Sequence, residues 1–324
     1  MQTRREFIKK GIAAGAAFSL VDLGGLFAAG ATAVGADAAA STSGNSTPGT
    51  PPATPDLIAV RDGDRVSMLD RAITGLGGMQ RFVKKGQTVV IKPNIGWDVV
   101  PERSANTHPD IVRRLVEMSL AAGASQVTVF DHTCDEWERC YKNSGIAAAV
   151  EAAGGKMLPG NDETWYRDVD LPNGIALKKT RIHTAILDSD VFINAPVLKH
   201  HGGATMTACM KNLMGIIWDR RFYHQNNLHQ CIADFISVKR PALNILDAYA
   251  PMMRNGPRGK SVDDLIPGVK TLLASTDIVA IDAASARILG HAQDGIEHVK
   301  IAGDAGFGTY KLDTLNIERV RLAA

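Results

Sequence analysis

Residues 88–94 read TVVIKPN, a short run of β-favouring residues that leads into Lys92, Pro93 and Asn94. Four further runs have the same form, and each is followed by a polar residue. They are QVTVF (126–130) before Asp131, VFI (191–193) before Asn194, LNIL (243–246) before Asp247, and VKTLLA (269–274) before Ser275, Thr276 and Asp277. Short β-rich runs of this kind are typical of strands covered on both faces, as in a parallel sheet.

Helical patterns lie between these runs. They cover residues 110–122, 146–153, 205–218, 228–238 and 276–289. The segment 110–122 has an amphipathic face and stops at Gly123, and the segment 276–289 starts at a capping residue. Strands and helices that alternate at this spacing predict right-handed βαβ units. We therefore expect a layered α/β fold, Rossmann-like, with a mostly parallel sheet and flanking helices.

The N-terminus has the features of a twin-arginine export signal. Residues 3–9 read TRREFIK, a weakly apolar stretch covers residues 11–33, and Val34, Gly35 and Ala36 suit signal-peptidase cleavage. The alternative is a chance arginine pair before a membrane anchor. Asp22 makes the stretch a poor permanent span. We expect export by the twin-arginine translocation machinery to a periplasmic or extracellular location, whether or not the signal is cleaved.

Composition divides the rest of the chain. Residues 37–55 are almost entirely small residues and proline, which predicts a flexible linker after a signal peptide over residues 1–36. Residues 56–324 are long enough for one large α/β domain or two closely joined ones. The net charge of +2 and the lack of a basic run after the signal argue against nucleic acid as a partner. We expect no stable membrane span in the mature form.

The four cysteines follow no cluster pattern. They are Cys134, Cys140, Cys209 and Cys231. An oxidising compartment permits a disulfide between Cys134 and Cys140, and free thiols are the alternative. No C-x-x-C is present, so we do not expect an iron–sulfur cluster held by this chain alone.

Polar residues at the predicted strand ends indicate a site, because ligands bind beyond the carboxyl ends of parallel strands. These residues are Asn94, Asp131, Asn194, Asp247 and Asp277, joined by Lys92, His132, Lys199 and His200. Asp and Asn also end strands for purely structural reasons, so each one alone indicates little. Together they favour a shared pocket over a set of turn residues.

The segment 194–215 is the densest in such residues. Gly202 and Gly203 permit a tight turn into the predicted helix 205–218. A glycine turn before a helix N-terminus suits an anion, with Lys199 and Lys211 as counter-charges. Neither a Walker A loop nor G-x-G-x-x-G after a strand is present, so nucleotide binding of those kinds is not indicated.

Histidines and arginines extend this hypothesis. His108, Asp131 and His200 form a candidate ligand set for a divalent metal, although no local metal motif fixes it. Arg258 lies in a turn-rich loop with Arg254, which either clamps an anion or is simply solvated. His108 either contributes to the site or leads into the helix 110–122.

Six motifs occur in order along the chain: IKPN (91–94), THP (107–109), INAPVLKH (193–200), KNLMG (211–215), NGP (255–257) and STDIVAID (275–282). With these motifs, the chain resembles the domain of unknown function 362 family over residues 87–308. The resemblance implies no assigned reaction. Some members resemble fusions to ferredoxin modules, which this chain lacks, and exported members with a twin-arginine signal are similar in layout.

We predict an enzyme or cofactor-dependent protein that binds a small anionic ligand. A metal or redox link stays open, the latter with an external electron carrier. The predicted catalytic residues are His108, His200, Lys199 and Asp131. The predicted ligand-binding residues are Lys92, Asn94, Asn194, Lys211, Asn212, Asp247 and Arg258. The alternative is a periplasmic protein that binds a ligand or metal, or assists assembly, without turnover.

Overall fold

A ten-stranded mixed sheet forms the centre of the computed structural model, which describes residues 53–323. Its main path runs β12-β1-β11-β10-β7-β2-β3-β4, with β8 paired to β10 and β9 paired to β8; β5 and β6 form a separate hairpin. The strands are β1 (Leu57–Arg61), β2 (Thr88–Pro93), β3 (Gln126–Val129), β4 (Lys156–Met157), β5 (Tyr166–Asp170), β6 (Lys179–His183), β7 (Val191–Ala195), β8 (Val197–His201), β9 (Thr205–Thr207), β10 (Leu243–Met252), β11 (Thr271–Ser275) and β12 (Ile317–Arg321).

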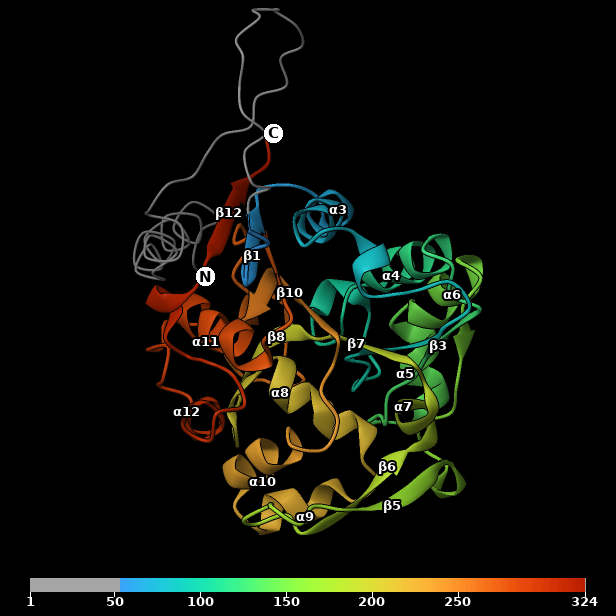
Figure 1. Cartoon of the computed structure of the whole chain (residues 1–324), viewed down its shortest axis with the longest axis vertical. Helices are drawn as coiled ribbons and strands as arrows, with labels where there is room; N and C mark the ends of the chain where they lie inside the picture. Colours follow the sequence, from blue (N-terminus) through green and yellow to red (C-terminus); the bar gives the residue numbers. More distant parts are fainter. Residues whose placement is uncertain (1–52, 324) are drawn as a thin grey trace, which may run out of the picture.

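Helices cover both faces of this sheet. They are α3 (Arg65–Gly75), α4 (Pro109–Ala121), α5 (Trp137–Asn143), α6 (Ile146–Ala152), α7 (Thr184–Asp188), α8 (Cys209–Asn212), α9 (Arg220–Gln225), α10 (Leu228–Phe235), α11 (Ile278–Ile288) and α12 (Glu297–Asp304). Figure 1 shows α3, α4 and α6 on one side of the central strands, with α8, α10, α11 and α12 on the other. Within residues 53–323, none of the helices has the length and apolar character needed to span a membrane.

Two hydrophobic cores explain why the strand sequences are apolar without alternation. In β2, Val89 and Ile91 belong to the core shared with α3, α4 and α6, whereas Val90 belongs to the core beneath α8, α10 and α11. Successive side chains of a strand point to opposite faces. A strand between two cores is therefore apolar at every position, as the sequence pattern indicates.

Most of the predicted elements are confirmed. The five apolar runs lie in β2, β3, β7, β10 and β11. The helices predicted over 110–122, 146–153, 228–238 and 276–289 correspond to α4, α6, α10 and α11, in that order. The parallel pairs β7–β2, β2–β3 and β3–β4 confirm the mostly parallel layout near the predicted site. The predicted signal peptide (1–36) and the linker up to residue 52 lie outside the described residues.

Two strand-end predictions are wrong. Strand β11 runs antiparallel to both β10 and β1, so Asp277 lies at the opposite edge of the sheet from the ends of β2 and β3. There Asp277 caps α11. Strand β10 continues to Met252, so Asp247 is within the strand, paired with Leu272, and does not end it.

The predicted helix over 205–218 is also wrong. Thr205–Thr207 is strand β9, which forms a hairpin with β8 around Gly202 and Gly203. Helix α8 begins only at Cys209, and a 3-10 turn (Leu213–Ile216) follows it. The first amides of α8, those of Cys209 and Met210, donate to the buried carboxylate of Asp282 at 2.7 and 2.9 Å. The proposed anion site at this helix N-terminus is therefore occupied by the protein's own carboxylate.

A change of strand partner brings Lys199 to the predicted site. Pro196 separates β7, which pairs with β2, from β8, which pairs with the second half of β10. In that register Met252 lies opposite Lys199. The chain thereby passes in front of the carboxyl ends of β2 and β3, and Lys199 reaches the side chain of Asn94 just beyond β2.

Candidate functional site

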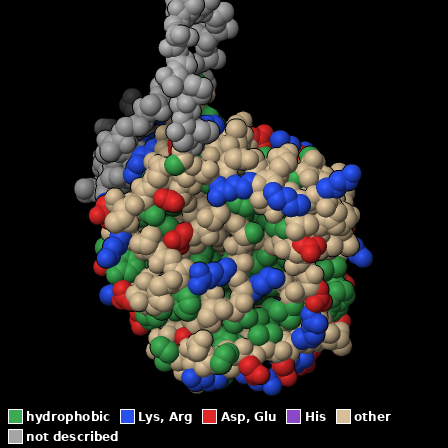
Figure 2. Space-filling view, viewed as in Figure 1, with side chains coloured by type: hydrophobic (Ala, Val, Ile, Leu, Met, Phe, Trp, Pro, Cys, Tyr) green, Lys and Arg blue, Asp and Glu red, His purple; other side chains and the backbone are tan. Residues whose placement is uncertain are grey.

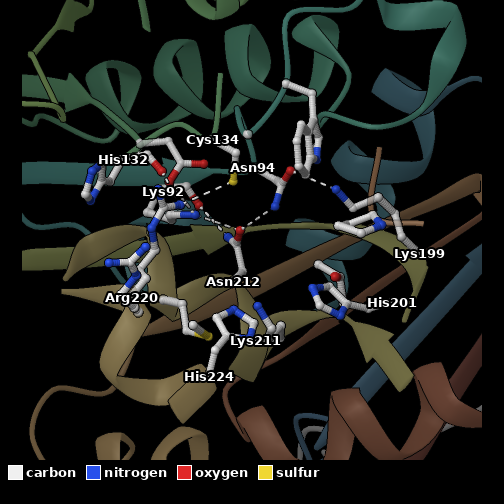
Figure 3. Close-up of a pocket in the computed structure, with 18 residues that line it drawn as sticks. Lys92, Asn94, His132, Cys134, Lys199, His201, Lys211, Asn212, Arg220 and His224 are labelled. Atoms are coloured by element: carbon white, nitrogen blue, oxygen red, sulfur yellow. Dashed lines mark hydrogen bonds and ion pairs between the residues drawn. The ribbon is translucent and has the colours of Figure 1, made fainter. Parts of the chain in front are cut away.

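A cavity of about 360 Å³ lies where β2 and β3 end and β8 crosses in front of them (Figure 3). Helix α8, the residues that follow it and helix α9 form its other wall. The lining residues are Lys92, Asn94, Gly96, Trp97, Asp131, His132, Cys134, Lys199, His201, Thr207, Lys211, Asn212, Met214, Gly215, Arg220, Arg221, His224 and Pro257. Segments between residues 92 and 257 thus meet at one place.

The lining has a strong excess of positive charge. Five lysine and arginine side chains contribute to it, against one carboxylate, that of Asp131. The face shown in Figure 2 is different: there Lys and Arg side chains are interspersed with Asp and Glu. Net charge over the sequence is only +2. The cavity therefore concentrates positive potential that the rest of the chain balances.

The carboxylate of Asp131 is already paired inside the protein. Its Oδ1 lies 2.9 Å from Lys92 Nζ, and its Oδ2 accepts the backbone N–H of Ile95 at 2.7 Å. Both side chains are almost fully buried. Burial lowers the pKa of Lys92 and raises the pKa of Asp131, and the attraction between them opposes both shifts. Asp131 therefore compensates Lys92 and leaves the other cations without a carboxylate in the lining.

Gly215 permits this pair to form. A Cβ atom at this position would lie 1.9 Å from Asp131 Oδ1 and 2.5 Å from Lys92 Nζ. Any side chain at residue 215 would displace one partner of the pair. The glycine of the KNLMG motif is thus required by close packing against the site.

Two asparagines connect Lys92 to Lys199 through hydrogen bonds. Lys92 Nζ and Asn94 Nδ2 both donate to Asn212 Oδ1, at 2.7 and 3.1 Å. Lys199 Nζ donates to Asn94 Oδ1 at 3.1 Å and to the carbonyl of Ala105 at 2.6 Å. The dashed lines of Figure 3 follow this chain of contacts across the cavity. The network fixes the orientation of both amide groups and the positions of both ammonium groups.

Lys199 and Lys211 have weakened affinity for protons. Burial is the main cause, and it lowers the pKa of Lys199 to about 7 and that of Lys211 to about 8. Repulsion from neighbouring cations adds to the effect, Lys211 acting on Lys199 and Arg220 acting on Lys211. Both amines consequently titrate near neutral pH.

Two histidines of the lining are neutral and have opposite tautomers. The ring of His201 accepts the N–H groups of Gly203 and Ala204 at Nδ1, both at 3.0 Å, so its proton is on Nε2. The ring of His132 bonds the carbonyl of Ile217 through Nδ1 at 2.9 Å, so Nδ1 carries the proton and Nε2 keeps a lone pair. Burial lowers the pKa of His132 to about 4 and that of His201 to about 3. One ring supplies a hydrogen-bond donor and the other an acceptor.

Arg220 joins α9 to the loop after β3. Its guanidinium donates to the carbonyls of His132 and Thr133 at 2.8 and 2.7 Å, and to the Sγ of Cys134 at 3.4 Å. These acceptors are neutral carbonyls and a thiol. Among the described residues no carboxylate is ion-paired with Arg220, so its positive charge is available to a ligand.

The structure brings together six of the predicted site residues. Lys92, Asn94, Asp131, Lys199, Lys211 and Asn212 line the cavity. Asn194 lies directly behind them, fully buried, where its Oδ1 accepts from Asn212 Nδ2 at 2.8 Å. It supports the site without lining it.

The other predicted residues lie elsewhere. His108 caps α4, and its backbone N–H donates to Asp247 at 3.3 Å. Asp247 also pairs with Arg65 at 3.4 Å, so it serves a separate contact. His200 accepts the N–H of Gly256 through its own ring Nδ1 at 3.3 Å. These residues have local partners and do not line the cavity.

Arg258 and the predicted metal ligands are also not brought together at the cavity. Arg258 is exposed and lies 3.5 Å from Asp135. Within residues 53–323, no three His, Cys, Asp or Glu side chains are grouped as a metal site would require, and His108, Asp131 and His200 are therefore not a ligand set. All four cysteines are free thiols, Cys134 and Cys140 included.

Sequence reasoning missed a second group of lining residues. They are Cys134, His201, Thr207, Arg220, Arg221 and His224. His132, by contrast, was named with the residues at the predicted strand ends, and it does line the cavity. The adjacent Arg220 and Arg221 lie beyond any strand end, in a segment whose path depends on the β8–β9 hairpin, so no local pattern could place them at the site.

Comparisons with known proteins give a family and distant structural similarity. The sequence profile of the family described as Domain of unknown function (DUF362) matches residues 89–287. A thylakoid-associated protein of Synechocystis sp. is 27% identical over 235 residues, which cover 70% of each chain.

Two solved structures are also similar. One is the lactate racemase apoprotein of Thermoanaerobacterium thermosaccharolyticum, with a TM-score of 0.46 and 13% identity over 69% of this chain and 55% of that one. The other is a Thermotoga maritima protein, with a TM-score of 0.45 and 9% identity over 75% of this chain and 60% of that one. This chain thus spans little more than half the length of those two proteins.

Replacement of Asp131 by Asn tests the buried pair. The amide keeps an acceptor for Ile95 but leaves Lys92 without its counter-charge, so we expect the free energy of unfolding to fall by about 3–5 kcal/mol in urea titrations. The double variant Lys92→Met/Asp131→Asn removes the uncompensated charge and should be more stable than the single variant. A double variant no more stable than Asp131→Asn would contradict the pairing.

Proposed function

This chain belongs to the DUF362 family, whose description names no reaction, and we propose from its own cavity that the protein binds a small organic anion. The observation that carries the proposal is the charge of the lining. Lys199, Lys211, Arg220 and Arg221 lie around a space whose single carboxylate is used by Lys92. Cations gathered in a partly buried space repel one another, and an anion relieves that cost.

The size of the cavity restricts the ligand. A volume of about 360 Å³ is at the lower end of the range for small-molecule sites. Nucleic acid would instead need a continuous basic surface, and positive and negative side chains are mixed on the face in Figure 2. A metabolite-sized anion with one or two carboxylate or phosphate groups suits the cavity best.

The residues of the lining have separable roles in binding. Arg220 and Arg221 offer planar donors suited to a carboxylate or phosphate, and Lys211 offers a point charge. The rings of His132 and His201 supply one acceptor and one donor to neutral parts of the ligand. The lining therefore recognises both the charge and the uncharged polar groups of a small molecule.

Replacement of Lys211 tests anion binding directly. Among the described residues the side chain of Lys211 has no hydrogen bond or ion pair, so Lys211→Met should leave the fold intact. We expect malonate, used as a probe, to bind about tenfold more weakly or worse in calorimetry, because a bond to a charged group contributes about 1.5–3 kcal/mol. Lys300→Met is the matched control, since Lys300 is exposed on α12 and pairs with Asp304. Equal losses in both variants would rule out a specific role of the cavity.

The dependence of binding on pH follows from the two lysines. Lys199, with a pKa of about 7, and Lys211, with a pKa of about 8, both lose their protons between pH 6 and pH 9. His132 and His201, with pKa values of about 4 and about 3, stay neutral over this range. An anion favours the protonated amines, so binding takes up protons.

Malonate is mainly a dianion over this range. Its affinity should therefore be highest near pH 6 and fall as pH rises, by about tenfold per pH unit for each lysine that must gain a proton. Calorimetry in two buffers of different ionisation enthalpy measures the proton uptake. Affinity that increases with pH would contradict the assignment.

We further propose that the chain is exported in the folded state to the periplasm. The proposal is supported by TRREFIK at residues 3–9, the apolar stretch 11–33 and the small residues at 34–36. These residues lie outside those that the structure describes. Folding before export is compatible with a site assembled from segments between residues 92 and 257.

The export signal is tested by the N-terminus of the protein recovered from cell fractions. Wild type should be found in the periplasmic fraction with a start near residue 37 in mass spectrometry, whereas Arg4→Lys/Arg5→Lys should stay in the cytoplasm with its full N-terminus. Cytoplasmic, unprocessed protein in both cases would refute the export proposal.

A further inference from the structure

The three lysines of the cavity have three different environments. Lys92 has a carboxylate partner, Asp131, at 2.9 Å. Lys211 is partly exposed, so water compensates some of its charge. Lys199 has neither: it is 1% exposed, and its two hydrogen-bond acceptors are a carbonyl and an amide oxygen.

Lys199 is therefore the amine with the strongest tendency to lose its proton. No ion pair links it to a carboxylate within the part of the chain that the structure describes. A buried ammonium without a counter-ion is costly, and Lys92 and Lys211 repel it further. The resulting pKa of about 7 leaves much of the amine neutral at neutral pH.

The hydrogen bonds of Lys199 leave its lone pair free. A neutral amine has two N–H groups, and the two acceptors, Ala105 O and Asn94 Oδ1, use both of them. The amide of Asn94 cannot easily reverse, because its Nδ2 donates to Asn212 Oδ1. The third position on Nζ is thus without a protein partner, and Lys199 lines the cavity beside Asn94 (Figure 3).

We propose that Lys199 is a catalytic amine that forms an imine with a small aldehyde or ketone carrying a carboxylate or phosphate group. The inference rests on the proposed function, since the neighbouring cations hold the anionic group. A desolvated lysine beside other cations is a suitable nucleophile for a carbonyl carbon.

The step balances without an external reagent. The lone pair of Nζ forms a bond to the carbonyl carbon, and the carbonyl π pair moves to oxygen, which takes up a proton. The C–O bond of this carbinolamine then breaks as the C=N bond forms. The oxygen leaves as water with the two hydrogens that the amine carried. No oxidant or reductant takes part.

One neighbouring group assists in this sequence. His201, two residues along β8 from Lys199, carries its proton on Nε2 and can donate a hydrogen bond to the carbonyl oxygen.

Reductive trapping on the full-length wild-type protein tests the proposal. The protein is incubated with pyruvate, or separately with dihydroxyacetone phosphate, in the presence of sodium cyanoborohydride at neutral pH. Peptide mass spectrometry then locates the reduced adduct. We expect it at Lys199, at a rate about a hundredfold or more above that of exposed lysines such as Lys300, because a pKa near 7 greatly increases the neutral fraction.

The two probes distinguish the anionic group. Faster trapping of pyruvate identifies a carboxylate substrate, and faster trapping of dihydroxyacetone phosphate identifies a phosphate substrate; either result supports the imine. Malonate, which has no carbonyl, should slow trapping by occupying the same cations. Lys199→Arg should lose the adduct, while Lys211→Met should keep it at Lys199 with a slower rate.

Failure of this inference is separable from failure of the proposed function. Adducts spread over exposed lysines, with Lys199 unmodified by both probes, would overturn the imine even if malonate binds as expected. An adduct at Lys199 that malonate does not slow would support the reactive amine but remove the role of the anion site. Because the decisive measurement is made on wild type, the stability of the variants does not affect it.

Discussion

Buried positive charge is the constraint on which this structure depends. Lys92 and Lys199 are each 1% exposed, yet they lie close enough to be connected through two asparagine side chains. Two ammonium groups removed from water are stable only if every donor has an acceptor and at least part of the charge is compensated. Asp131 compensates Lys92, and Asn212 and Asn94 provide acceptors between the amines. Within residues 53–323 the charge of Lys199 has no such carboxylate partner, and its burial therefore lowers the pKa of this lysine.

The sequence predicts most of the fold because its signals are local. An apolar run with no alternation is sufficient to identify β2 and β7 as strands buried on both faces. The direction of a strand is not a local property, however. Nothing within residues 271–275 distinguishes an antiparallel β11 from a parallel one, so Asp277 was placed at the wrong edge. The hairpin of β8 and β9 was missed for a similar reason, since a glycine pair permits both a hairpin and a helix start.

The site was predictable to the extent that strand ends determine it. Lys92, Asn94 and Asp131 follow from the parallel pairing of β2 with β3, which brings both carboxyl ends to the same edge. The position of Lys199 is harder to predict, because the chain changes its strand partner at Pro196: β7 pairs with β2, and β8 pairs with β10. His201 and Arg220 required the three-dimensional path of the chain, and the metal hypothesis required three side chains that have separate local partners. Tautomers were beyond sequence reasoning altogether, since they depend on backbone amides and carbonyls at particular distances.

The site is rigid before any ligand binds, and this affects how it responds to one. Gly215 and Gly160, from separate segments, both lie against Asp131: a Cβ atom would be 1.9 Å from its Oδ1 in the first case and 2.0 Å from its carbonyl oxygen in the second. Asn194 holds Asn212 from behind. With so little free space around the buried pair, a ligand cannot be accommodated by rearrangement of the floor of the cavity. What a ligand can change is protonation, because Lys199 and Lys211 titrate near neutral pH. An anion therefore converts the amines to ammonium groups, whereas a carbonyl compound engages the neutral form, and a molecule that carries both groups requires one lysine in each state.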